Sequence, residues 1–135
     1  MGDVERPSDL RFTLDDEWAR HDDGRVVIGI TDYAQQQLGD IVFVELPEAD
    51  TAVTQGKPFG VIESVKAVSD LNSPISGKIV EVNQTLIDKP ETVNEDCYGD
   101  GWLCVISPAA EVELEGLLDA AAYRRHVDER SEPES

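Results

Sequence analysis

The stretch ESVKAVSD, residues 63 to 70, places a lysine inside a segment that reads nearly the same from either end. Folded as a hairpin, the segment would pair matched residues across two strands: Val65 with Val68, Ser64 with Ser69, and Glu63 with Asp70. The valine and serine pairs suit neighbouring strands, whereas the acidic pair would repel. Lys66 and Ala67 would then form a two-residue tip, where turn geometry favours Asn-Gly or another glycine pair. Lys-Ala offers neither, so turn chemistry does not explain these residues.

Lys66 is one of four lysines, and it has small or apolar neighbours and no basic residue nearby. An amine at the apex of a hairpin can be approached from several sides, and the flanking carboxylates could serve recognition. This placement suits enzymatic acylation, which would remove the lysine charge. The alternative is an ordinary surface lysine on an edge loop. The residues alone leave both interpretations open.

The other residues that could act as nucleophiles or metal ligands are poorly placed. Cys104 lies in WLCVI, which is typical of a buried strand, and Cys97 precedes the turn YGDG. His21 and His126 lie near opposite ends of the chain, without ligand-like spacing to either cysteine. We therefore expect no metal site, no Cys/His nucleophile and no disulfide framework.

Length and charge limit the classes of function. A chain of 135 residues with 40% apolar residues suits one folded domain with a modest core. The net charge of −18 argues against binding to nucleic acid or to anionic membranes. It favours basic surfaces on protein partners, or reflects an acidic proteome. No apolar run approaches the roughly 20 residues that span a bilayer. The polar N-terminus predicts a cytoplasmic protein, or a mitochondrial matrix protein if a transit peptide was removed.

The elements around Lys66 are predicted to be mostly β. Apolar, β-branched segments indicate strands at residues 26–30, 41–46, 61–65, 78–82 and 101–106. Thr31 can cap a short helix that Gly39 ends, and Pro90 can open one helical turn. Ser107 is expected to cap a helix with Pro108 in its first turn, and Asp119 a second one.

A weak internal repeat accompanies these elements. GDIVFVE, residues 39–45, aligns with GKIVEVN, residues 77–83, on either side of the lysine segment. The alternative is chance similarity between two β segments. Taken with the palindrome, the repeat suggests two similar β halves related by a pseudo-twofold axis near Lys66.

Longer motifs give the sequence a specific resemblance. It is similar to the H protein of the glycine cleavage system, a lipoyl carrier, from about Leu10 to Tyr123. The matching stretches are DDEWAR, IGITDYAQQQLGD, IVFVELPE, FGVIESVKAVSDLNSPISG, VNEDCYGDGWL and LLDAAAY. Several long motifs in register are far more specific than one short pattern. The family's E-S-x-K-[AS] motif places its lipoylated lysine at Lys66.

The resemblance implies a non-catalytic carrier with lipoate joined to Lys66 as an amide by a lipoyl or octanoyl transferase. The arm would accept the aminomethyl group of glycine from a pyridoxal-phosphate glycine decarboxylase, the P protein. It would present this group to a tetrahydrofolate-dependent aminomethyltransferase, the T protein. Dihydrolipoamide dehydrogenase, the L protein, would then reoxidise it. The partner enzymes and cofactors would supply the difficult chemistry, and the carrier is expected to be a monomer.

The resemblance also implies a dry groove that protects the loaded arm from water. In the family the acid of the Glu-Trp motif lies by this groove, which makes Glu17 the candidate for contact with the arm's amine. The alternative for Glu17 is a solvated surface acid. The sequence departs from the family pattern at Asp16, where histidine is usual, and at Cys97, where proline is usual.

The elements and the resemblance together predict a mostly β barrel-sandwich hybrid of two small antiparallel sheets with short peripheral and C-terminal helices. Residues 1–127 would form the single domain, with a lipoyl-binding core at 25–107 and an acidic disordered tail at 128–135. The nearest alternative is a lipoyl carrier for 2-oxoacid dehydrogenases or for a regulatory system. A biotin carrier would place methionine beside its lysine, and Met1 is the only methionine. A small Cys/His enzyme and an unmodified binding module are the alternatives from other classes.

Overall fold

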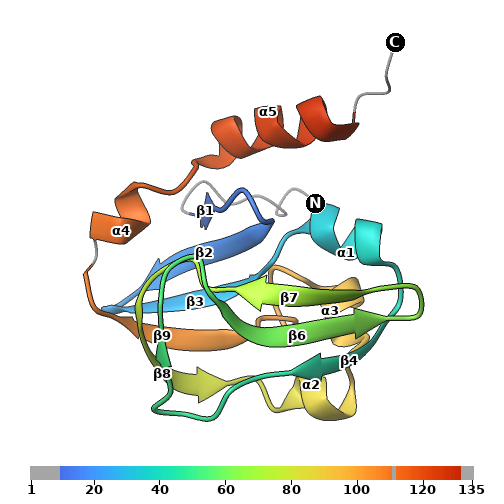
Figure 1. Ribbon diagram of the computed structural model, residues 1–135, viewed down its shortest axis with the longest axis horizontal. Helices are drawn as coiled ribbons and strands as arrows, with labels where there is room; N and C mark the ends of the chain where they lie inside the picture. The colour runs from blue at the N-terminus through green and yellow to red at the C-terminus, as the bar shows by residue number, and fades with distance from the viewer. Residues whose placement is uncertain (1–9, 111, 132–135) are drawn as a thin grey trace.

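The computed structural model describes residues 10–110 and 112–131, which form two antiparallel sheets with short helices around them (Figure 1). The six-stranded sheet has the order β1 (Leu10–Phe12), β2 (Glu17–Asp22), β3 (Arg25–Ile30), β9 (Cys104–Pro108), β8 (Gly77–Val82) and β5 (Ala52–Val53). The three-stranded sheet has the order β4 (Ile41–Glu45), β6 (Pro58–Ser64) and β7 (Val68–Asn72). The prediction of a mostly β fold with two antiparallel sheets is confirmed.

Within the described ranges, five short helices lie around the sheets. They are α1 (Asp32–Leu38), α2 (Thr85–Asp88), α3 (Thr92–Glu95), α4 (Val112–Glu115) and α5 (Ala120–Ser131). The C-terminal helix α5 lies beside β1, and α1 lies near the hairpin end of the smaller sheet (Figure 1). No helix within the described ranges has the length and apolar character needed to span a membrane.

The predicted caps of α1 and α5 are confirmed. The Thr31 side chain accepts a hydrogen bond from the backbone of Ala34 at 3.2 Å, as an N-cap residue should. Gly39 ends α1 with φ of 81° and ψ of −154°, a positive-φ conformation that lies outside the left-handed helical region and that only glycine adopts readily. The Asp119 carboxylate accepts from the backbone of Ala122 at 2.8 Å and so caps α5.

Two expectations about the C-terminal part are corrected. Ser107 and Pro108 do not start a helix, because both belong to β9 and pair with Lys78 and Gly77 of β8. The strand predicted at 101–106 therefore begins later, at Cys104, and runs to Pro108. Helix α5 continues to Ser131, so residues 128–131 of the expected tail are helical; residues 132–135 lie outside the described part.

The packing around β1 and β2 fixes where the N-terminal turn and α5 lie. Trp18 is fully buried, and Gly29 of the neighbouring strand makes room for it, since an added Cβ would lie 2.6 Å from the indole. Phe12 of β1 stacks on Tyr123 of α5, with ring centroids 4.6 Å apart. Buried aromatic pairs of this kind contribute about 0.5–1.5 kcal/mol beyond the area they bury. This aromatic contact holds α5 against β1.

Candidate functional site

Lys66 lies at the tip of the hairpin formed by β6 and β7, but the predicted register is wrong. Val68 pairs with Glu63, and the following rows pair Ser69 with Ile62 and Asp70 with Val61. Each β7 residue therefore has a partner two residues earlier than the palindrome suggested. Ser64 faces Ala67 through a 2.8 Å hydrogen bond from its backbone N–H to the Ala67 carbonyl. The tip is Val65-Lys66 rather than Lys66-Ala67.

A serine side chain replaces the turn glycine that this tip lacks. The Ser64 hydroxyl accepts hydrogen bonds from the backbones of Lys66 at 3.3 Å and Ala67 at 3.1 Å. Ser and Thr hydroxyls can close a turn in this way. The backbone N–H of Val65 donates to the Asp40 carbonyl at 3.1 Å, which ties the tip to the segment after α1. Local hydrogen bonds, rather than matched side-chain pairs, define the hairpin end.

The Lys66 side chain is exposed and passes the C-terminal end of α1. A Cβ built on Gly39 would lie 3.6 Å from the Cε atom of Lys66. The neighbouring side chains are apolar and also exposed, with Val65 at 70% and Val68 at 67%. The lysine side chain is thus accessible, and its stem passes Gly39, which directly follows the last residue of α1.

A groove that we call the acidic groove lies between α1, the hairpin strands and the turn between β1 and β2. It has a volume of about 170 Å³. Its lining comes from the turn between β1 and β2, from β3 and α1, and from the hairpin strands: Asp15, Asp16, Glu17, Ile30, Ala34, Gln37, Leu38, Ile62, Ser69, Asp70 and Leu71. Apolar and acidic residues therefore line one hollow. Such a lining suits an aliphatic chain that ends in a cationic amine.

Glu17 lines this groove. It is not a solvated surface acid, which was the alternative left open by the sequence. Its side chain is buried, with 3% exposure. Oε1 accepts from the Thr13 hydroxyl at 2.7 Å, and Oε2 accepts from the backbone N–H of Asn72 at 3.1 Å. Burial raises the pKa of Glu17 from 4.5 to about 8, although both hydrogen bonds oppose this shift. The carboxyl group thus joins the β1–β2 turn to the end of β7.

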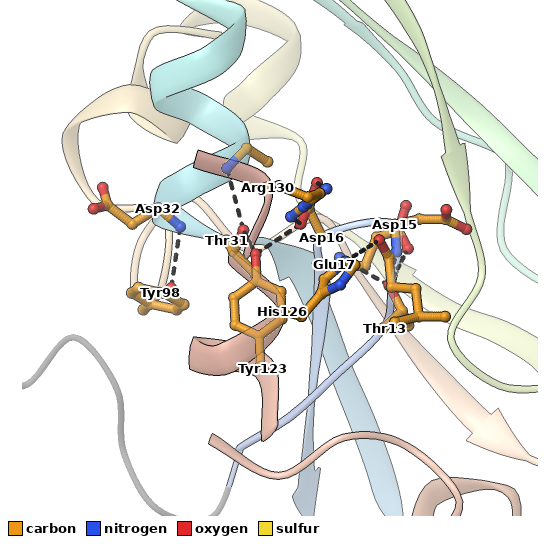
Figure 2. A network of polar contacts seen from close by, with 12 residues as sticks. Thr13, Asp15, Asp16, Glu17, Thr31, Asp32, Tyr98, Tyr123, His126 and Arg130 are labelled. Carbon is orange, nitrogen blue, oxygen red and sulfur yellow. Dashed lines mark hydrogen bonds and ion pairs between the residues drawn. The ribbon is translucent and has the colours of Figure 1, made fainter. Parts of the chain in front are cut away.

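The structure also reveals a polar network that the sequence analysis missed. The Asp16 carboxylate accepts two hydrogen bonds from the Arg130 guanidinium, at 2.5 and 3.2 Å, and one from the Tyr123 hydroxyl at 2.8 Å (Figure 2). The Tyr123 hydroxyl also lies 2.7 Å from the Thr31 hydroxyl. Burial raises the pKa of Tyr123, which keeps the phenol protonated. No sequence signal predicts these contacts, because Asp16 and Arg130 lie 114 positions apart.

The two cysteines occupy structural positions. Both are buried and unpaired, and burial raises the pKa of the Cys97 thiol to about 12, which leaves it unreactive near neutral pH. The Trp18 indole donates to the Cys97 carbonyl at 3.0 Å. A proline at this position would present the same carbonyl, so the departure at Cys97 is compatible with this contact. Residues 10–110 and 112–131 contain no cluster of three or more His, Cys, Asp or Glu side chains arranged to hold a metal.

Comparison of the chain with known proteins points to a single family. The family model described as "Glycine cleavage H-protein" matches residues 10–130. The chain belongs to this family.

Individual relatives agree with the family match. Glycine cleavage system H proteins from Anaeromyxobacter sp. strain K and from Myxococcus xanthus are each 55% identical to the chain. The first alignment covers 94% of this chain and 99% of the relative, and the second covers 87% and 91%. A crystal structure of a glycine cleavage system H protein from Mycobacterium marinum superposes with a TM-score of 0.82 at 44% identity. That alignment covers 88% of this chain and 96% of the other.

Family membership gives the general role of the molecule. Glycine cleavage H-proteins are the lipoyl-bearing carrier component of the glycine cleavage system, so this chain is a carrier within that system. The groove and the exposed lysine are consequently parts of a carrier.

Proposed function

We propose that Lys66 carries the lipoyl group and that the loaded arm folds back into the acidic groove. The observation that carries this proposal is the position of Lys66, whose exposed side chain passes Gly39, the residue that follows the groove-lining Leu38. The other lysines have ordinary structural positions. Lys57 lies in the turn before β6, Lys78 pairs with Ser107 in the sheet, and Lys89 follows α2.

The residues fit a lipoyl-lysine arm. A lipoyl amide on Lys66 would supply a cyclic disulfide that accepts the aminomethyl group of glycine at sulfur. Ile62, Leu71 and Leu38 provide apolar contacts for the aliphatic part of the arm, and they exclude water from that part of the groove. Exclusion of water matters because a carbon that bears both nitrogen and sulfur breaks down to ammonia and formaldehyde in water.

The carboxyl groups of the groove can bind the amine end of the cargo. Asp15, Asp70 and Glu17 line the same hollow, whereas the Asp16 carboxylate is engaged by Arg130 and Tyr123. A hydrogen bond to a charged group contributes about 1.5–3 kcal/mol. Glu17 is already held by Thr13 and Asn72, so its position is fixed before the arm arrives. A nearby ammonium group would favour the ionised form of Glu17 and lower its pKa. We therefore keep Glu17 as the candidate arm contact.

The partner enzymes would perform the bond changes. A lipoyl or octanoyl transferase would modify Lys66, and glycine decarboxylase would load the carrier. Aminomethyltransferase would unload it onto tetrahydrofolate, and dihydrolipoamide dehydrogenase would reoxidise the dithiol. The chain itself would hold, protect and release the cargo without catalysing a step. Its monomeric state and cytoplasmic location stay predictions.

A reconstituted glycine cleavage assay with the three partner enzymes tests this function. Lys66→Arg should fold normally but abolish turnover, because arginine keeps the charge and has no amine that can be acylated. Lys57→Arg is the matched control and should retain full turnover. Full turnover by Lys66→Arg would contradict the proposal. Lipoylated wild type that supports a 2-oxoacid dehydrogenase complex but not glycine cleavage would point to the alternative carrier role.

A further inference from the structure

Helix α5 contacts two walls of the acidic groove at once. One wall is the turn between β1 and β2, with residues 15–17, and another wall is α1, with Ala34, Gln37 and Leu38. The Arg130 guanidinium binds Asp16 of the turn through two hydrogen bonds, and its carbon lies 4.6 Å from the ring centre of Tyr33 on α1. A planar guanidinium can pair with a carboxylate and stack on an aromatic ring simultaneously. Arg130 therefore joins the two walls.

Tyr123 makes a second connection between the same walls. Its hydroxyl donates to Asp16 at 2.8 Å and lies 2.7 Å from the hydroxyl of Thr31, the N-cap of α1. The ring is fixed by its stacking on Phe12. Figure 2 shows Thr31, Tyr123, Asp16 and Arg130 converging from three segments that are distant in the sequence. Two α5 side chains thus set the spacing between α1 and the turn.

The turn itself is held from both sides. Asp16 has φ of 73°, a left-handed conformation that aspartate and asparagine tolerate better than most residues. In this conformation its carboxylate meets α5, while its neighbours face the hairpin. Asp15 accepts from the Asn72 side chain at 3.2 Å, and Glu17 accepts from the Asn72 backbone. The groove wall is therefore fastened to α5 on one side and to β7 on the other.

We propose that α5 acts as a clamp that fixes the width of the acidic groove, with Asp16, Tyr123 and Arg130 as positioning residues for the lipoyl arm. The inference rests on the proposed function of the groove. The two oxygens of the Asp16 carboxylate accept from the two terminal nitrogens of one guanidinium, a paired geometry that fixes the turn against α5. The central contact of the clamp is the pair formed by the Asp16 carboxylate and the Arg130 guanidinium.

The first test uses the full-length, unmodified chain and does not depend on lipoate. Amide hydrogen exchange would be measured by NMR in Asp16→Asn, Arg130→Gln and Tyr123→Phe. Asparagine tolerates the left-handed backbone, and phenylalanine keeps the stacking on Phe12. Exchange at the Thr31 and Asn72 amides, which hydrogen-bond to the turn, should accelerate by about three- to tenfold. Arg125→Gln, which removes an exposed charge from the same helix, should leave both amides unchanged.

A double variant separates a shared clamp from independent effects. Asp16→Asn combined with Arg130→Gln should accelerate exchange no more than the stronger single variant, because both changes remove one interaction. If the acceleration of exchange in the double variant equals the product of the two single accelerations, the two residues act separately and the clamp is overturned. Unchanged exchange in both single variants would overturn it as well.

The second test measures formaldehyde release from the loaded carrier without tetrahydrofolate. Wild type should release formaldehyde more slowly than a small lipoamide adduct, and Arg130→Gln should release it about three- to tenfold faster than wild type. Protection by wild type and equal protection by Arg130→Gln would overturn the clamp alone. Release from wild type at the rate of the small adduct would overturn the groove's role in the proposed function.

Discussion

The two turns that matter for the site are built in opposite ways. The turn between β6 and β7 carries Lys66 and is closed by the Ser64 hydroxyl and backbone groups alone, with Val65 largely exposed. The turn between β1 and β2 is tied to α5 through Asp16 and to β7 through Glu17. One turn leaves its central side chains in solvent, and the other has almost all of its polar side chains engaged.

This contrast suggests that the two turns serve different tasks, access at the β6–β7 turn and a fixed shape at the β1–β2 turn. Under the proposed function, Lys66 must be reached by a transferase and by several partner enzymes, and the exposed tip around it should contribute little to the stability of the fold. Under the same proposal, the groove wall must keep a fixed shape to hold a flexible arm, because ordering the arm has an entropic cost that a preformed site reduces. Substitutions in the two turns should therefore differ in their effects on stability and on function.

The largest difference in stability is expected between Tyr123→Ala and Val65→Ala. Tyr123 is buried and stacked on Phe12, so its loss leaves a cavity and should lower the free energy of unfolding by about 3–5 kcal/mol. Val65 is 70% exposed at the hairpin tip, and its truncation should change that free energy by less than about 0.5 kcal/mol. Urea denaturation followed by far-UV circular dichroism measures both. An equal decrease in the free energy of unfolding in both variants would contradict the proposed difference between the two turns.

The second prediction concerns Glu17, the buried carboxyl group at the turn between β1 and β2. The folded-state pKa of Glu17, about 8, lies above its ordinary value of 4.5. Between these two pH values the folded state holds a proton that the unfolded state has lost, so wild type loses stability as the pH rises. Glu17→Gln resembles the protonated acid and removes this dependence. Its stability relative to wild type should therefore increase by about 3 kcal/mol between pH 5 and pH 8.

Denaturant unfolding of both proteins across this pH range gives the measurement. Glu63→Gln is the matched control, because it removes an acid from the open hairpin, where the side chain is only partly buried. The Glu63→Gln series gives the background against which the Glu17→Gln difference is read. A Glu17→Gln difference that stays flat from pH 5 to pH 8 would mean that Glu17 is ionised throughout and that burial does not control it.

The smallest of these effects is expected at Ser64. Its hydroxyl closes the hairpin tip by accepting from the backbones of Lys66 and Ala67, so Ser64→Ala should lower the free energy of unfolding by about 1 kcal/mol. Ser64→Thr keeps a hydroxyl and should lose less. Lipoylation of Lys66 by its transferase should slow in the alanine variant, since the tip loses its defined shape. Wild-type stability and a wild-type lipoylation rate would show that the backbone alone shapes the tip.

Local signals in the sequence predicted much of the fold. The caps of α1 at Thr31 and Gly39, and the apolar β-branched runs that form β3, β4 and β8, all depend on residues close together in the chain. The helix expected at Ser107 failed because pairing with β8 outweighed a good capping sequence. Strand β2 was not predicted, since its residues EWARHD are mostly polar and its inner face is recognisable only after β3 is placed.

The candidate site also contains contacts that local sequence signals did not predict. The family motif marked Lys66 and Glu17, but the palindrome gave the wrong register, because matched side chains say less about a hairpin than the hydroxyl that closes it. The contacts of Asp16 with Tyr123 and Arg130 span more than 100 positions. Long-range polar contacts of this kind have no local pattern, so a single sequence does not predict them.

The central claim is that Lys66 is the residue that carries the lipoyl group, and peptide mapping tests it most directly. The chain would be co-expressed with a lipoyl transferase, digested and analysed by tandem mass spectrometry. The account predicts one lipoyl group per chain, located on the peptide that contains Lys66, with Lys57, Lys78 and Lys89 unmodified. Lipoate on one of those three lysines with Lys66 free, or a chain that stays unmodified beside an active transferase, would contradict the account.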